Sequence, residues 1–111
     1  MMDFDIHDEF SVLKLQIIEA LRQVIDPELQ INIIDLGLVY AVNVDGPESL
    51  ITVDMTLSSK YCPMGESILS AVKNCLEHNF KDYKAQVELV WEPVWSFDKI
   101  SEEGKRLLSG D

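Results

Sequence analysis

The stretch that decides the fold runs from Thr52 to Glu66 and reads TVDMTLSSKYCPMGE. From Ile51, the residue just before this stretch, to Leu57, apolar and polar residues alternate, which is typical of a β-strand with one buried face. The apolar residues of this strand are Ile51, Val53, Met55 and Leu57. After Ser58 the alternation stops, and from Met64 onward apolar residues recur at helical spacing. The stretch therefore predicts a strand, a hydroxyl-rich loop and a helix, in that order.

Cys62 stands where the predicted loop becomes the predicted helix. Pro63 suits the first position of a helix, because the N–H that proline lacks has no partner there in any case. Cys62 is then at or next to the N-cap, where the helix dipole and free backbone N–H groups lower the pKa of a thiol. Cys62 is the best candidate for chemistry in this sequence.

The alternative for any free cysteine is that it is a small buried hydrophobic residue. Cys62 lies outside both apolar patterns, and its neighbours are polar: Ser58, Ser59, Lys60 and Tyr61. Cys75 lies on the apolar face of the same predicted helix, and we interpret it as a core residue.

Length and composition limit the function classes. A chain of 111 residues with 47% hydrophobic content suits one globular domain, which we place at residues 10–111 after an acidic, flexible N-terminus at residues 1–9. The net charge of −11 argues against nucleic-acid and anionic membrane partners, and no segment is apolar over the ~18 residues that span a bilayer. Two cysteines do not form a disulfide framework, so we expect a reducing cytoplasm.

Residues 10–25 have the pattern of an amphipathic helix. Its apolar stripe is Leu13, Ile17, Ala20, Leu21 and Val24, and its polar residues, Lys14, Glu19, Arg22 and Gln23, fall on other faces. The helix is predicted to end at Asp26, because a residue that precedes a proline is disfavoured in the α conformation.

The next segment, residues 26–37, contains three acids, Asp26, Glu28 and Asp35, and has no clear periodicity. A connection of this length is often functional. The alternative is that Asp26 caps a turn, Glu28 is solvated, and Asp35 starts a turn that Gly37 closes.

The remaining segments predict a mixed sheet. Residues 38–44 alternate like a strand, and the turn-forming residues 45–48 join them to the strand of residues 50–57 as an antiparallel hairpin. A third strand, residues 85–91, follows the helix that begins after Cys62. The connection is a right-handed crossover, so this strand should lie parallel to residues 50–57.

The C-terminal part predicts a closing segment and a short helix. The alternation breaks at Pro93, and we expect Trp91 and Trp95 to close one end of the core. Ser101 is a suitable N-cap for a last helix. The predicted fold class is α+β, with a three-stranded mixed sheet packed with helices in the order α-β-β-α-β-α.

Three groups of segments together resemble the SufT/PaaD-like family of iron–sulfur cluster assembly domains. They are Asp26–Leu29 with Ile34–Tyr40, Met55–Leu57 running on to Cys62 and Pro63, and Trp91–Trp95 with Ser101 beyond it. The resemblance covers nearly the whole chain. It implies a compact α/β domain without enzymatic turnover of its own, which matures or delivers iron–sulfur clusters to client proteins.

By position, the resemblance implies a reactive cysteine at Cys62, which would be the metal ligand. It places the acidic pair of the family's first loop at Asp26 and Glu28. The hydroxyl residue four positions before the cysteine is Ser58. With Thr56, these residues would shape the pocket that binds the cofactor.

Iron–sulfur clusters are normally held by about four thiolates, and one exposed cysteine cannot supply them. A transient cluster or iron would therefore be bridged between two protomers through both copies of Cys62, so a homodimer belongs to this hypothesis. Alternatively, the domain is an adaptor between an assembly scaffold or carrier and its client apoproteins, without metal contact. A thiol enzyme would need a general base near Cys62, and His7 and His78 are poorly placed for this.

Overall fold

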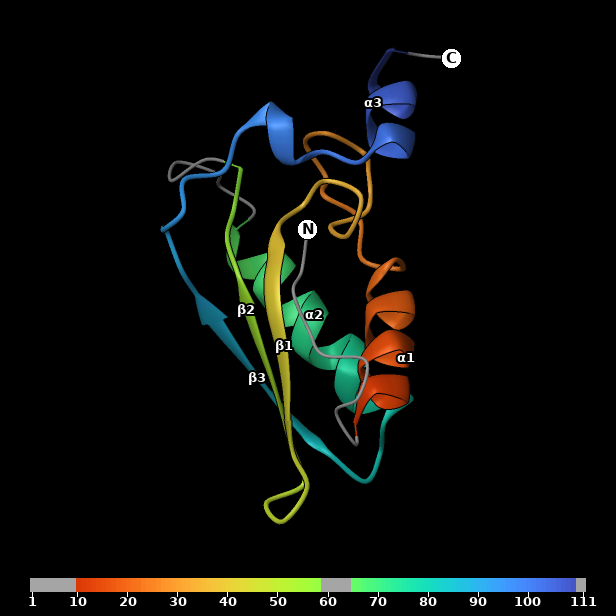
Figure 1. The fold of residues 1–111 in the computed structure, drawn as a ribbon, viewed down its shortest axis with the longest axis vertical. Coiled ribbons are helices and arrows are strands. Elements are labelled where there is room, and N and C mark those ends of the chain that lie inside the picture. The colour runs from red at the N-terminus through yellow and green to blue at the C-terminus, as the bar shows by residue number, and fades with distance from the viewer. Residues whose placement is uncertain (1–9, 59–64, 110–111) are drawn as a thin grey trace.

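The computed structural model describes residues 10–58 and 65–109. Its elements are, in order, α1 (Ser11–Leu21), β1 (Val39–Asp45), β2 (Leu50–Met55), α2 (Gly65–Asn79), β3 (Lys84–Leu89), the 3-10 helix η1 (Phe97–Lys99) and α3 (Glu102–Ser109) (Figure 1). The α+β class and the predicted order of helices and strands are confirmed. The predicted flexible N-terminus, residues 1–9, and the segment with Cys62 and Pro63 lie outside the described residues.

The sheet has the order β1-β2-β3, with β2 in the middle. β1 and β2 form the predicted antiparallel hairpin, and β3 lies parallel to β2, as the crossover predicted. In the register, Val53 of β2 is opposite Val42 of β1 and Val87 of β3. The alternation explains this arrangement, because it turns Ile51, Val53 and Met55 to the same face of the sheet.

The hydrophobic core lies between that face of the sheet and the two longer helices, α1 and α2 (Figure 1). Its fully buried members include Ile17 and Leu21 from α1, Val72 and Leu76 from α2, and Ile51, Val53 and Met55 from β2. Burying a side chain of this size stabilises a fold by about 1.5–3 kcal/mol. None of the helices in the described part of the chain is long and apolar enough to cross a membrane.

The interpretation of Lys14 as an outward-facing residue of α1 is wrong. Lys14 is only 8% exposed, whereas Val12 and Leu15 are 67% and 54% exposed. Lys14 lies three residues before the fully buried Ile17, so both share one face of the helix. The long aliphatic stem of a lysine can cover apolar side chains in such a place.

Two long connections meet at one end of the sheet, where β1 begins and where β2 and β3 end (Figure 1). They are residues 22–38, between α1 and β1, and residues 90–101, between β3 and α3. These connections carry most of the motifs that the sequence singles out.

Candidate functional site

Asp26 organises the first part of the loop that follows α1. Its Oδ1 accepts hydrogen bonds from the backbone N–H groups of Glu28 at 2.8 Å and Leu29 at 3.0 Å. Its carbonyl accepts a hydrogen bond from the N–H of Gln30 at 2.7 Å, and the residue is 1% exposed. Asp26 therefore caps a turn, which its short acceptor side chain favours. Glu28, by contrast, is exposed.

Asp35 joins three parts of the chain. Its Oδ1 accepts hydrogen bonds from Arg22 Nη1 at 3.0 Å and Ser101 Oγ at 2.9 Å, and its Oδ2 accepts one from Asn32 Nδ2 at 2.7 Å. Its backbone carbonyl accepts a fourth, from the N–H of Ser101 at 2.7 Å. Arg22 follows α1, and Ser101 Oγ caps α3 through the N–H of Gly104 at 2.9 Å. We call Arg22, Asn32, Asp35 and Ser101 the Asp35 cluster.

The environment of Asp35 lowers the pKa of its carboxyl group below the ordinary value. Burial acts in the opposite direction and is the largest single influence. The hydrogen bonds from Asn32, Ser101 and Arg22, together with the charge of the Arg22 guanidinium, outweigh burial. The folded protein therefore favours the ionised form of Asp35.

We expect this lowered pKa to make the protein less stable in acid. A carboxyl group with a lowered pKa in the folded state contributes stability above its unfolded pKa of about 3.9, and this stability is lost as the pH falls through the folded pKa. The urea midpoint of the wild type should therefore fall more steeply below about pH 4 than that of Asp35→Asn. Parallel curves for the two proteins between pH 6 and pH 2 would contradict this.

The connection from β3 to α3 is tied to the same end of the sheet. Trp95 Nε1 donates a hydrogen bond to the carbonyl of Leu36 at 2.7 Å, and Tyr40 Oη donates one to the carbonyl of Pro93 at 2.7 Å. The ammonium of Lys99 lies 5.3 Å from the centre of the Tyr40 ring, in the range of a cation–π contact. Trp91 and Trp95 also pack against the core. The expectation that the tryptophans close one end of the core is confirmed.

The two hydroxyl residues of the predicted pocket follow β2 at this end. Thr56 is 1% exposed, and its N–H donates a hydrogen bond to the carbonyl of Leu38 at 2.8 Å. This bond ties the end of β2 to the loop between α1 and β1. Ser58 is half-buried and is the last residue described before the segment that contains Cys62.

The structure thus places Asp26, Glu28, Thr56 and Ser58 on the segments that meet at this end of the sheet. Cys62 lies outside the described residues, so the pocket that these five residues would share stays a prediction. Within residues 10–58 and 65–109, no three His, Cys, Asp or Glu side chains come close enough together to hold a metal ion.

Cys75 has a different environment. It is half-buried against the core, and its Sγ donates a hydrogen bond to the carbonyl of Ala20 at 3.3 Å, where α2 meets α1. Burial raises the pKa of this thiol, although a hydrogen bond from Asn79 acts in the other direction. Cys75 therefore stays a thiol at neutral pH, and its interpretation as a packing residue is supported.

The Asp35 cluster is the part of this region that sequence reasoning missed. The sequence allowed a turn at Asp35 as one of two alternatives and predicted a helix cap at Ser101, but it gave no sign that these residues, 66 positions apart, bond to each other. The only signal was indirect, because both residues belong to the segments on which the resemblance rests.

Fold and site together define a class: a small α+β domain that gathers the connection before β1, the residues after β2 and the connection after β3 at one end of its sheet. Residues 14–89 match the family model described as iron–sulfur cluster assembly protein. The chain belongs to this family.

Relatives and solved structures agree with this family. The chain is 50% identical over 85 residues to the Fe-S protein maturation auxiliary factor SufT of Staphylococcus aureus, which covers 77% of this chain and 96% of that protein. It is 42% identical over 98 residues to the auxiliary factor YitW of Bacillus subtilis, covering 88% of this chain and 95% of that protein. A domain of unknown function from Bacillus anthracis has a TM-score of 0.84 and 36% identity, with 88% of this chain and 92% of that chain covered.

Proposed function

We propose that this chain is an auxiliary factor in the maturation of iron–sulfur proteins. The observation that carries the proposal is the 50% identity, over 85 residues, to a protein named as such a factor. The segment that matches the family model, residues 14–89, spans Cys62 and the other four residues of the predicted pocket. The partners would be an assembly scaffold or carrier and client apoproteins, in the cytoplasm.

In this function Cys62 holds iron or a cluster transiently as cargo. Asp26 acts through the loop, because its Oδ1 is already bonded to two backbone N–H groups. Glu28 is exposed and offers the free carboxylate, and Thr56 and Ser58 shape the pocket from the end of β2. Oxygen and sulfur ligands of this kind suit a labile iron site.

One chain offers too few thiolates for a cluster, which normally needs about four. The chain has two cysteines, and the thiol of one of them, Cys75, is hydrogen-bonded to the carbonyl of Ala20 where α2 contacts α1. A cluster would therefore be shared by the Cys62 thiolates of two protomers, with small thiols or carboxylates in the remaining positions.

The second candidate is an adaptor that joins a scaffold to its clients without touching metal. The commitment of Asp26 to its own turn favours this candidate, because it removes one of the two predicted carboxylates from metal binding. Under either candidate we propose no enzymatic turnover. His78, which is exposed in the last turn of α2, is about 20 Å from the first residue of that helix at a rise of 1.5 Å per residue, too far to serve as a base for a cysteine just before it.

Anaerobic reconstitution with iron and sulfide tests the proposal. We expect the wild type and the matched control Cys75→Ser to take up iron with visible absorbance, and Cys62→Ser to lose at least about nine-tenths of it, since thiolates are the normal cluster ligands. Iron content per chain and sizing are the measurements.

Two outcomes would change the conclusion. Equal loading of Cys62→Ser would remove Cys62 as a ligand. If no variant binds iron under conditions that load a known scaffold, the adaptor is the better description, and the next experiment is to capture the protein partner that an adaptor requires.

A further inference from the structure

β3 forms one edge of the sheet and leaves part of its backbone open. The N–H groups of Lys84 and Val90 donate to β2 and its flank, at Ser49 (2.9 Å) and Met55 (2.8 Å). Because backbone groups alternate along a strand, those of Ala85, Val87 and Leu89 face away from β2. Among the described residues, the one hydrogen bond found on this side joins the N–H of Ala85 to Glu77 Oε2 at 3.1 Å.

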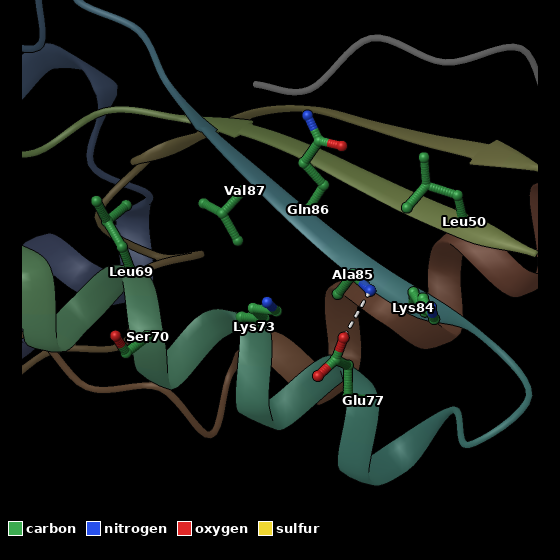
Figure 2. A pocket seen from close by; sticks show the side chains of 9 residues that line it. All are labelled: Leu50, Leu69, Ser70, Lys73, Glu77, Lys84, Ala85, Gln86 and Val87. Atoms are coloured by element: carbon green, nitrogen blue, oxygen red, sulfur yellow. Dashed lines mark hydrogen bonds between the residues drawn. The ribbon is translucent and has the colours of Figure 1, made fainter.

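A groove of about 500 Å³ runs beside this edge, between β3 and α2. Figure 2 shows Leu69, Ser70, Lys73 and Glu77 of α2 along one side of β3, and Gln86 on the other face of the sheet. Lys73 is exposed, and so are Lys84, Gln86 and Glu88, the outward residues of β3. An open strand edge with room beside it is a template for pairing with another strand.

The charges on the outer face of β3 are self-complementary. If a second β3 pairs antiparallel about a two-fold axis at Gln86, each Gln86 lies opposite its own copy. Lys84 then lies opposite Glu88 of the second copy, and Glu88 opposite its Lys84, which gives two cross-strand pairs of opposite charge.

The same axis also matches the charges of α2. Glu77 is level with Ala85, to which it is bonded, and α2 runs antiparallel to β3 because it connects two parallel strands. One step along β3, about 3.3 Å, corresponds to about two residues of helix, so Gln86 is level with residue 75. The two-fold axis therefore passes at the level of residue 75 in α2. Lys73 precedes this level by two residues and Glu77 follows it by two, so Lys73 of one copy faces Glu77 of the other.

In this arrangement Glu77 exchanges one partner for another. It leaves the N–H of Ala85 and pairs with Lys73 of the second copy. The N–H of Ala85 becomes free to bond to the carbonyl of Val87 of the second copy, as opposite residues of an antiparallel pair do. The N–H of Ala85 therefore still has an acceptor after Glu77 has left it.

We propose that the free edge of β3 is a homodimer interface, in which two copies pair antiparallel about Gln86 and form one continuous sheet. Charge complementarity singles out a second copy of this chain as the occupant, because both layers of charges match about one axis. The proposal goes beyond the proposed function and involves no metal. It places the ends of the two β2 strands, from which the segments with Cys62 continue, at opposite ends of the joint sheet, so this dimer is distinct from a pair of protomers that would share a cluster through both Cys62 thiolates.

Disulfide cross-linking tests the register. In iron-free Cys62→Ser protein, we expect Gln86→Cys to form a covalent dimer under mild oxidation, because non-hydrogen-bonded pairs have Cα atoms about 4.5 Å apart, within the range for a disulfide. The matched control is Glu88→Cys on the same face, which would be about 14 Å from its own copy and should stay monomeric on a denaturing gel. Equal cross-linking of the two variants, or none in either, would overturn the proposal.

Charge reversal tests the complementarity. We expect Lys84→Glu to weaken dimerisation about tenfold or more in sedimentation experiments at low salt, and the double variant Lys84→Glu/Glu88→Lys to restore it. A wild type that is monomeric at millimolar concentration, or a dimer that Lys84→Glu leaves unchanged, refutes the interface. Because every sample is free of iron, these results do not depend on whether Cys62 binds a cluster.

Discussion

Asp35→Ala is expected to lower the free energy of unfolding by about 3 kcal/mol. The substitution removes the acceptor for Arg22, Asn32 and Ser101 at once. Hydrogen bonds to a charged group contribute about 1.5–3 kcal/mol each. The contribution of the Arg22 bond to this free energy is taken as small, because the Arg22 side chain is 40% exposed and water can replace much of the bond.

Urea unfolding at pH 7 measures this effect, with Asp82→Ala as the control. Asp82 is an exposed acid for which no hydrogen bond is found among the described residues, and its removal should change stability by less than about 0.5 kcal/mol. If the two variants unfold at the same urea concentration, Asp35 does not hold this end of the sheet together.

The strands and the crossover could be predicted from the sequence, because each depends on a local pattern. The alternation at Ile51, Val53 and Met55 identified the buried face of β2, and all three residues are fully buried. The turn-forming residues 45–48 specified a hairpin, and a helix between strands specified a parallel third strand. Such signals need only neighbouring residues.

The contacts at the end of the sheet could not be predicted in the same way. The bond between Asp35 and Ser101 joins loops whose meeting depends on the whole fold. Lys14 was misplaced because the sequence does not show how deeply the aliphatic stem of a lysine can be buried beside apolar side chains. The sequence also gave no sign that the side-chain Oε2 of Glu77 accepts a hydrogen bond from the backbone N–H of Ala85, because Ala85 lies on the next strand.

The candidate site was predictable in part. The sequence allowed two roles for Asp26, as a pocket residue or as a turn cap, and the structure shows the cap. A carboxylate that caps a turn can still shape a pocket through the loop. In the proposed pocket the contribution of Asp26 would be geometric, and Glu28 is the better position at which to test directly whether the chain binds iron.

Gly37→Ala is expected to be the most damaging substitution at a glycine in this region, with a loss of about 3 kcal/mol or more. Gly37 has a φ angle of +74°, a conformation that costs other residues about 1–2 kcal/mol. A Cβ atom at this position would also lie 2.3 Å from the carbonyl oxygen of Lys99, which is backbone and cannot rotate away. Either the turn or the connection to α3 has to shift.

The shift should spread to the neighbouring contacts of that connection. Lys99 lies over Tyr40, and Trp95 bonds to Leu36, the residue just before Gly37. We therefore expect the tryptophan fluorescence of Gly37→Ala to move to longer wavelength in the folded state, together with a lower urea midpoint.

Gly46→Ala is the matched control for Gly37→Ala. Its Cβ would meet the ring of Phe10 at 2.8 Å, but this is the end of a side chain that can turn aside, and Gly46 has no positive φ. We expect a loss of less than about 1 kcal/mol, which is the usual size for a change that the surroundings can absorb. If both alanines cost the same, the close approach of Gly37 to Lys99 does not decide how the connection to α3 packs.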